Sequence, residues 1–148
     1  MTYELINICG QGLFFKLDGF RMLYCGIALF MWSVSLLFSK EYFAHHSHKA
    51  RYYGFMLLTM AATLGVFLSA DFLTLFIFFE VMSLSSYVWV AQEETEEALS
   101  AGKTYLAVAV IGGMVMLMGL FLLNDAIHTL RMDELYDAAQ GVWVEKSA

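Results

Sequence analysis

Glu80 is an acidic residue near the middle of a 21-residue apolar run, DFLTLFIFFEVMSLSSYVWVA, at residues 71–91. An acidic side chain at the centre of a membrane-spanning helix costs roughly 2.5–3.5 kcal/mol on insertion scales, so it needs a function or a partner. Ser83 and Tyr87 follow Glu80 at three and seven positions, and on a helix they share its face. We therefore predict that Glu80 binds a proton and that Ser83 and Tyr87 order water beside it.

Lys103 is the second charged residue that the pattern places inside an apolar helix. If that helix starts near Ala98, Lys103 lies roughly 7.5 Å along it, while Glu80 lies about 18 Å from Gln92. The two charges then differ in depth by roughly 10 Å, which water and the long lysine stem can bridge. A carboxyl group among apolar side chains holds a proton more readily than one in water, and an approaching cation displaces that proton. Lys103 is thus predicted to modulate proton transfer and to relay it.

Each of these residues also has a purely structural interpretation. Glu80 could hydrogen-bond between helices, and Lys103 could extend its amine to the membrane surface. The hydroxyls of Ser83, Ser85 and Ser86 could bond back to their own helix, as small packing residues do.

The remaining polar groups give no sign of enzyme chemistry. His45, His46 and His48 fall in a polar loop and are interpreted as a solvated face. We expect no metal site, no cofactor and no catalytic residue, because no metal-ligand set, phosphate loop or nucleophile–base arrangement occurs in the sequence.

Composition places these residues in a membrane protein. Of the 148 residues, 60% are hydrophobic and only 15% are charged, against about 45–50% and about 25% in soluble domains. Four apolar runs are long enough to span a bilayer, at about 20 residues each. The predicted fold class is all-α and integral to the membrane, with four transmembrane helices and a short surface helix near the C-terminus.

The chain divides into an N-terminal surface segment at 1–18, a four-helix transmembrane domain at 19–124 and a C-terminal surface tail at 125–148. The predicted spans are, in order, 19–40, 51–70, 71–91 with Asp71 as a plausible N-cap, and 98–124. Residues 1–18 favour a short hairpin and lack a signal-peptide pattern, so the first span is expected to be retained. The surface helix is predicted at 132–140, with Gly141 ending it.

The charged residues predict the class of partner and the orientation of the chain in the membrane. The net charge of −6 argues against nucleic acid as a partner. Four basic residues fall on the side of the two loops and three close to the opposite side, so loops 41–50 and 92–100 are predicted to be cytoplasmic. The expected location is the cell membrane, crossed several times.

Two motifs carry a resemblance to a known family. Glu80 is followed by Met82-Ser83-Leu84-Ser85-Ser86-Tyr87, and the next helix holds Ala101-Gly102-Lys103-Thr104-Tyr105 and the pair Gly112-Gly113. This pattern resembles the antiporter-like membrane subunits, which include the proton-translocating subunits of respiratory complex I, Mrp-type cation/proton antiporters and membrane-bound hydrogenases. GLFFKLDGFRMLY upstream and TLRMDELYDAAQG downstream extend the likeness to the third to sixth helices of that family.

The resemblance implies that Glu80 is the intramembrane glutamate of the family's fifth helix and Lys103 the lysine that opens its sixth. In the family the glutamate pairs with a lysine on a broken seventh helix, which this sequence does not contain. The expected function is that of a partial, split or short subunit of an ion-translocating complex, redox-driven or Mrp-type, that moves protons or exchanges sodium for protons. A non-catalytic transport subunit of a hydrogenase or NADH dehydrogenase-type complex fits this description, and the plain Met start and the tail VWVEKSA favour a natural short chain.

The expected partners are other membrane subunits, above all a chain supplying the remaining antiporter-like helices, together with the lipid bilayer, the proton and the sodium ion. Two alternatives remain. One is a structural scaffold without transport, and the other is a small four-helix multidrug-type transporter coupled to protons.

Overall fold

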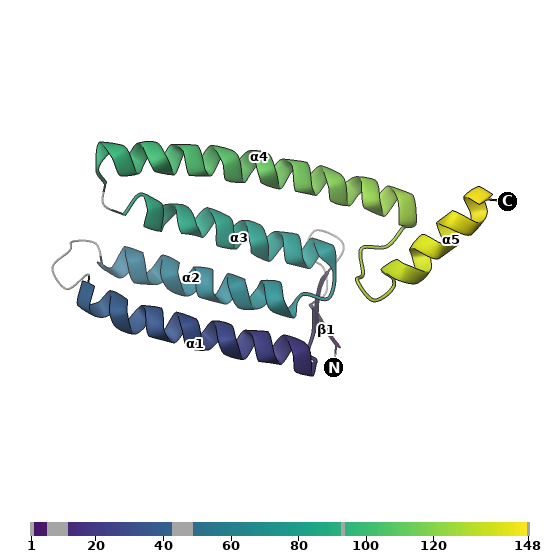
Figure 1. The fold of residues 1–148 in the computed structure, drawn as a ribbon, viewed down its shortest axis with the longest axis horizontal. Helices are drawn as coiled ribbons and strands as arrows, with labels where there is room; N and C mark the ends of the chain where they lie inside the picture. Colours follow the sequence, from purple (N-terminus) through teal and green to yellow (C-terminus); the bar gives the residue numbers. More distant parts are fainter. Residues whose placement is uncertain (1, 6–11, 43–48, 93, 148) are drawn as a thin grey trace.

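The protein is a row of four long helices with small elements at one end, as the computed structural model shows (Figure 1). The structure describes residues 2–5, 12–42, 49–92 and 94–147. Within them the elements are β1 (Thr2–Leu5), β2 (Leu13–Lys16), α1 (Gly19–Tyr42), α2 (Lys49–Leu68), α3 (Phe72–Val90), α4 (Glu96–Ile127) and α5 (Leu135–Ser147).

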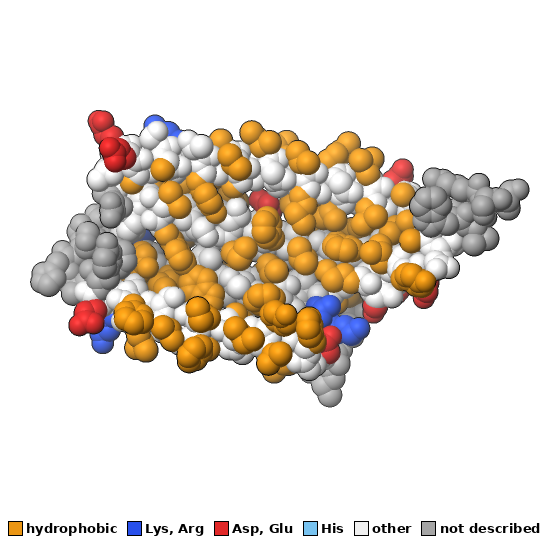
Figure 2. Space-filling view, viewed as in Figure 1, with side chains coloured by type: hydrophobic (Ala, Val, Ile, Leu, Met, Phe, Trp, Pro, Cys, Tyr) orange, Lys and Arg blue, Asp and Glu red, His pale blue; other side chains and the backbone are white. Residues whose placement is uncertain are grey.

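The four long helices lie side by side in chain order and run alternately up and down (Figure 1). Each is long and apolar enough to cross a membrane. Large hydrophobic side chains remain exposed along the row, including Phe20, Phe30, Val108 and Met114 (Figure 2). Such an apolar surface suits lipid or neighbouring helices better than water. The predicted all-α class, with four spans and a short C-terminal helix, is confirmed.

Three helices begin at side chains that cap them. The backbone N–H of Arg21 donates to Asp18 Oδ1 at 2.9 Å, and that of Thr74 donates to Asp71 Oδ2 at 3.0 Å. Thr95 caps α4 in the same way, accepting from the N–H of Ala98 at 3.1 Å. Each cap satisfies one of the backbone donors that the first helical turn leaves unpaired. The predicted cap at Asp71 is confirmed.

The boundaries of two helices differ from the prediction. α4 begins at Glu96 and ends at Ile127, outside the predicted limits of 98 and 124. The predicted C-terminal helix is present as α5, but it spans Leu135–Ser147 and not 132–140, so the prediction that Gly141 ends it was wrong. A glycine ends a helix by taking a positive φ, but Gly141 keeps a helical one, at a cost of about 1 kcal/mol relative to alanine.

One end of the row is tied together by backbone hydrogen bonds. β1 and β2 pair in antiparallel fashion, with Thr2 opposite Lys16 and Leu5 opposite Leu13, which confirms the predicted hairpin. The turn between α2 and α3 joins this hairpin and the segment after α4, with bonds from Ala70 N to Phe14 O at 2.8 Å, Phe72 N to Leu130 O at 3.0 Å and Met132 N to Ala70 O at 3.2 Å. We call this the strapped end. The opposite end, where α1 and α3 finish and α2 and α4 begin, is called the loop end (Figure 1).

Small and hydroxylated residues fill the contacts between the helices. Thr59 of α2 and Ser85 of α3 are both buried, and their side-chain oxygens lie 2.7 Å apart. Gly65 of α2 accepts the ring of Phe78, which would overlap a Cβ atom at that position. Small residues let membrane helices approach closely, and α2 and α3 consequently pack as the tightest pair.

Candidate functional site

Glu80 lies on the face of α3 that packs against α4. A Cβ atom at Gly113 of α4 would lie 2.5 Å from Glu80 Oε1 and 2.7 Å from its Cδ, so the carboxyl group occupies space that only glycine leaves open. Figure 2 shows acidic atoms surrounded by hydrophobic side chains between the two helices. The carboxyl group therefore sits at a helix–helix contact, far from either end of the bundle.

One oxygen of this carboxyl group has no hydrogen-bond partner in the part of the chain that the structure describes. Glu80 Oε1 is buried and makes no hydrogen bond to the described residues. Leaving a buried acceptor unsatisfied costs roughly 1–3 kcal/mol, and more when the group is charged. The geometry thus leaves Oε1 open to a hydrogen bond from water or from a donor on a neighbouring helix.

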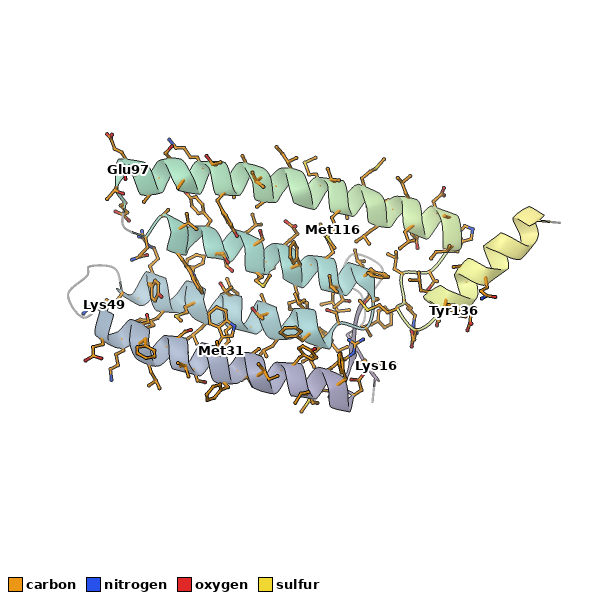
Figure 3. The ribbon with its side chains drawn as sticks, viewed as in Figure 1. Lys16, Met31, Lys49, Glu97, Met116 and Tyr136 are labelled. Carbon is orange, nitrogen blue, oxygen red and sulfur yellow. The ribbon has the colours of Figure 1, made fainter. Side chains whose placement is uncertain are left out.

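Ser83 and Tyr87 also face α4. The backbone oxygen of Ser83 accepts a hydrogen bond from Tyr105 Oη at 3.0 Å. The ring of Tyr87 lies against Gly102, where an added Cβ would come within 3.0 Å of it. Figure 3 shows the side chains of α3 and α4, Met116 among them, projecting into the space between these helices. The predicted common face of Glu80, Ser83 and Tyr87 is present, whereas their roles in proton transfer stay predictions.

Lys103 does not join this group. It is exposed and follows Gly102 by one residue, which turns it about 100° away from the face that contacts α3. It precedes Gly113, the residue opposite Glu80, by ten positions, or about 15 Å along the helix. The separation exceeds the predicted value of roughly 10 Å, because the residue of α4 that lies opposite Glu80 is further along the helix than assumed. Any coupling between Lys103 and Glu80 must therefore pass through other groups.

The neighbouring serines behave as packing residues. Ser85 and Ser86 both donate to the backbone oxygen of Met82, at 3.1 Å and 2.7 Å. Ser85 also meets Thr59 across the contact with α2. The hydroxyls of Ser85 and Ser86 therefore fit the interpretation that they bond back to their own helix, as small packing residues do.

Two residues of the sequence motifs contribute to the site in ways that the sequence did not indicate. Gly113 makes room for the carboxyl group, and Tyr105 connects α4 to the backbone of Ser83. Their residue types gave a signal, since a glycine pair and a tyrosine stand out in an apolar helix. Their roles depend on which part of α4 faces Glu80, and a single helix pattern does not contain that relation.

The charged groups at the strapped end are structural. Asp18 accepts the backbone N–H of Arg21, and this hydrogen bond lowers the pKa of the carboxyl group below its usual 3.8. The Arg21 side chain lies 3.3 Å from Asp18 and also donates to the backbone oxygen of Ser69. At Asp133, a hydrogen bond from Arg131 lowers the pKa in the same way. These charges fasten the start of α1 and the segment between α4 and α5.

Metal ligands do not gather in the described part of the chain. Within it, no cluster of three or more His, Cys, Asp or Glu residues could hold a metal ion. The predicted solvated face at His45, His46 and His48 lies outside the described residues.

Comparison with known proteins gives partial relatives. The chain is 31% identical over 111 residues to the Na(+)/H(+) antiporter subunit A1 of Staphylococcus epidermidis, covering 74% of this chain and 14% of that protein. It is 29% identical over 135 residues to the putative antiporter subunit mnhD2 of Staphylococcus haemolyticus, covering 85% and 27%. The chain thus spans about a quarter or less of the length of these relatives.

A solved structure has the same arrangement of helices. The chain resembles a chain of the membrane-bound sulfane sulfur reductase, an archaeal respiratory membrane complex, with a TM-score of 0.70 and 24% sequence identity over 88% of this chain and 27% of that one. A sequence model described as "NADH:quinone oxidoreductase/Mrp antiporter, TM" matches residues 69–147, which include Glu80, Lys103 and more than half of the 148 residues. The chain therefore belongs to the transmembrane family of NADH:quinone oxidoreductases and Mrp antiporters, as an antiporter-like membrane subunit.

Proposed function

We propose that this chain forms part of an ion-translocating membrane complex, redox-driven or Mrp-type, and that Glu80 takes part in proton or sodium/proton transfer. The observation that carries the proposal is the carboxyl group at the α3–α4 contact, with one buried oxygen unpartnered among the described residues. Acidic residues inside membrane helices are rare and mark proton or ion pathways. Family membership and the named antiporter relatives support the same interpretation.

The neighbouring residues have distinct proposed roles. Ser83 and Tyr87 order water on the face of α3 that carries Glu80. Lys103 modulates Glu80 through intervening groups, because Lys103 lies about 15 Å along α4 from Gly113, the residue opposite Glu80. The exposed lysine also faces away from α3, which leaves it accessible to a neighbouring helix. Each charge moved across 100 mV corresponds to about 2.3 kcal/mol, so displacing the lysine can couple proton binding to a membrane potential.

The proposed complex supplies further helices that pack against these four. The proposed partners are the remaining antiporter-like helices, on further polypeptide or on another subunit, in contact with the exposed side of α4. That side carries large apolar residues such as Val108, Ile111 and Val115 and would otherwise face lipid. By resemblance to the family, a lysine on one of these helices would provide the donor for Glu80.

The orientation of the chain is also a proposal. Loops 41–50 and 92–100 connect helices whose joined ends lie at the same end of the bundle (Figure 1). The basic residues in and beside these loops, Lys40, Lys49, Arg51 and Lys103, favour the cytoplasmic side of the cell membrane. Residues 1–18 and 125–148 would then lie at the opposite surface, on either side of the transmembrane domain at 19–124.

Glu80→Gln in the assembled complex tests the proposal. The amide keeps the size of the side chain but cannot carry the proton, so coupled proton or sodium transport in membrane vesicles should fall at least tenfold while assembly persists. Glu97→Gln is the control, because Glu97 is exposed in the first turn of α4. Transport by Glu80→Gln at the normal rate would remove Glu80 from the mechanism.

The scaffold alternative makes the opposite prediction. If Glu80 only joins α3 to α4, Glu80→Gln should impair assembly and leave transport intact in whatever complex still forms. Native mass spectrometry of the purified complex, combined with transport per assembled complex, separates the two. The multidrug-type alternative gains no support from the family match and predicts efflux by this chain alone.

A further inference from the structure

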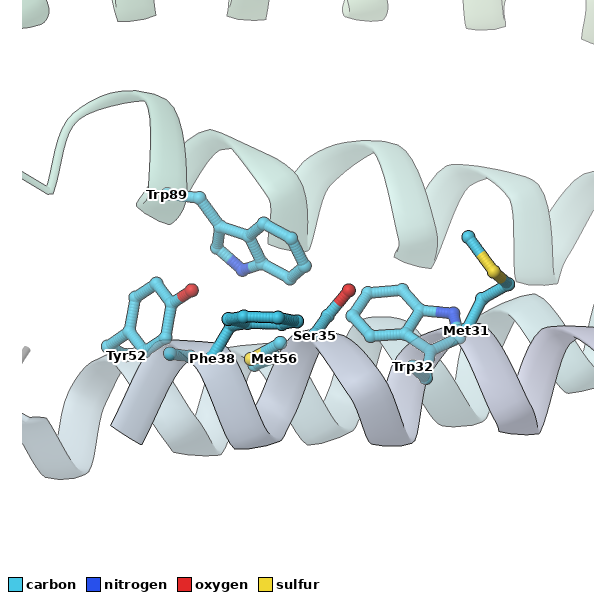
Figure 4. A pocket seen from close by; sticks show the side chains of 8 residues that line it. Met31, Trp32, Ser35, Phe38, Tyr52, Met56 and Trp89 are labelled. Carbon is cyan, nitrogen blue, oxygen red and sulfur yellow. The ribbon is translucent and has the colours of Figure 1, made fainter. Parts of the chain in front are cut away.

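An open groove with a volume of about 660 Å³ lies between α1, α2 and α3, close to the loop end (Figure 4). On α1 its lining extends from Met31 to Ser39, eight residues or about 12 Å of helix. Ser39 lies three residues before α1 ends at Tyr42, so the groove begins within about one turn of the helix end. Half of a hydrocarbon core of roughly 30 Å is about 15 Å, so the groove has the depth of one membrane leaflet. We call it the loop-end groove.

The loop-end groove is mainly apolar. Met56 of α2 forms its floor and is only 2% exposed, whereas Met31 and Phe38 of α1 lie at its rim and are 59% and 73% exposed. Methionine side chains are flexible and fill irregular apolar spaces. Pockets of about 300–1,000 Å³ with mostly apolar and aromatic linings are typical of ligand sites. The groove therefore suits an apolar ligand, and it opens on a part of α1 that is apolar enough to cross a membrane.

Three aromatic residues form one wall of the groove. The ring of Trp89 lies 6.1 Å from that of Tyr52 and 5.4 Å from that of Trp32, measured between centroids. Figure 4 shows the indole of Trp89 extending from α3 toward α1 and α2, with Tyr52 and Trp32 on either side of it. Tyr52 is close to the start of α2 and Trp89 close to the end of α3, so both lie near the loop end. Tyrosine and tryptophan are enriched where a bilayer meets water, and this wall thus runs inward from the level of the lipid headgroups.

A lysine stands at the loop-end mouth of the groove. Lys49 begins α2 and precedes Met56 by seven positions, or two turns, so it shares the face of α2 that carries Tyr52 and Met56. It is exposed, and its side chain leans toward the start of the helix, which is the loop end (Figure 3). Its ammonium group has three donors and can bind a phosphate oxygen while it also contacts the protein.

The neighbouring charged side chains do not share this position. Lys40 and Glu41 follow Ser35 by five and six positions, which places them about 140° and 120° around α1 from that lining residue. Arg51 is ion-paired with Glu94, with 2.6 Å between nitrogen and oxygen. Within the described residues, the lysine that begins α2 is thus the cation at the loop end that shares a helix face with the groove lining.

We propose that the loop-end groove holds one acyl chain of an anionic phospholipid, whose phosphate group binds at Lys49. The apolar lining, the depth of one leaflet and the cation at the mouth match the parts of such a lipid. A helix segment about 12 Å long and about 10–12 Å across occupies on the order of 1,000 Å³, so a partner helix can rest on the rim but does not fit inside. The proposal is independent of the proposed function, because it involves neither Glu80 nor transport.

Phospholipids with a photoreactive diazirine on the acyl chain test the site in the assembled complex. The complex is placed in vesicles of equal parts phosphatidylglycerol and phosphatidylcholine, with one of the two lipids carrying the diazirine, and cross-links are mapped by mass spectrometry. Met56 should be labelled about fivefold more by the phosphatidylglycerol probe, the ratio expected for one lysine beside an anionic lipid. Leu37, exposed on the other side of α1, should be labelled equally by both probes. An unlabelled Met56 would mean that protein covers the groove and would overturn the proposal.

Two pairs of variants separate the headgroup from the acyl chain, with the amount of complex measured on native gels. Lys49→Ala should bring the ratio of the two probes at Met56 to within about twofold of one, whereas Lys40→Ala should leave it unchanged. Ser35→Trp fills the groove and should lower labelling of Met56 by both probes at least tenfold, whereas Ser33→Trp, on the opposite exposed side of α1, should not.

Two results would contradict the assignment. A ratio near one in the parent complex, or a ratio that Lys49→Ala leaves unchanged, would overturn the binding of the phosphate at this lysine. Labelling of Met56 that Ser35→Trp leaves unchanged would overturn the position of the acyl chain in the groove.

Discussion

Gly113→Ala introduces one methyl group against the carboxyl of Glu80. The added Cβ would lie 2.5 Å from Oε1, 2.7 Å from Cδ and 2.8 Å from Oε2, against 3.4 Å or more in ordinary contact. The nearest atom therefore has to move by about 0.9 Å, the difference between 3.4 and 2.5 Å. Either the carboxyl group is displaced or α3 and α4 separate. Overpacking of this kind costs typically about 1–3 kcal/mol, which corresponds to roughly a 5- to 150-fold change in an equilibrium.

The assay is transport per assembled complex in membrane vesicles, with the amount of complex measured on native gels. Gly113→Ala should lower transport or assembly at least fivefold. Gly112→Ala is the matched control, because a Cβ at Gly112 meets nothing within 4 Å in this chain. Glu80→Ala removes the clashing group, so adding Gly113→Ala to that variant should cost no further assembly.

The last comparison is a double-mutant cycle and isolates the contact between the two residues. Normal transport and assembly in Gly113→Ala would refute the placement of the carboxyl group against α4. Equal damage from Gly113→Ala in the presence and absence of the Glu80 side chain would refute it as well.

Three further outcomes are expected. Gly65→Ala should lower the yield of assembled complex, because the new Cβ overlaps the ring of Phe78. Adding Phe78→Leu should restore part of that yield, and a yield that stays equally low in the double variant would contradict the overlap. Tyr105→Phe removes the 3.0 Å hydrogen bond to Ser83, and, at about 0.6 kcal/mol for such bonds in membrane bundles, should lower the thermal stability of the purified complex only slightly. A hydrogen bond from Arg131 lowers the pKa of Asp133, so the stability that this carboxylate contributes is present above its usual pKa of 3.8 and is lost as the pH falls through the lowered value. Asp133→Asn should therefore flatten the loss of heat resistance that the purified complex shows as the pH falls below 3.8.

The sequence was sufficient for most of the fold because the signals are local. Four apolar runs correspond to four spans, and Asp71 marks the start of α3 with a side chain that caps it. The helix at 135–147 was misplaced because Gly141 was interpreted as a stop, although a glycine also fits inside a helix. Whether a glycine ends a helix depends on the residues that follow and on what they contact.

The shared face of the candidate residues on α3 was predictable from the sequence, whereas their distance from Lys103 was not. Glu80, Ser83 and Tyr87 share a face because helical spacing dictates it. The position of Lys103 required knowledge of which residue of α4 lies opposite Glu80, and Gly113 determines that. A pocket lined by Trp32, Thr59, Ser83 and Tyr105, among others, takes side chains from all four long helices at once, a relation that no single run of sequence contains.

The hydrogen bonds at the strapped end also have a consequence for biosynthesis. Ala70 accepts from Met132, and Phe72 donates to Leu130, residues that follow about 60 positions later. At synthesis rates of roughly 5–20 residues per second, these partners emerge some 3–12 s after the turn between α2 and α3 has been made. During that interval the backbone of the turn is without these bonds, and the whole of α4 has to be inserted before they can form. The hydrogen bonds of the strapped end therefore form late in biogenesis, and they form only after all four helices have been inserted into the membrane.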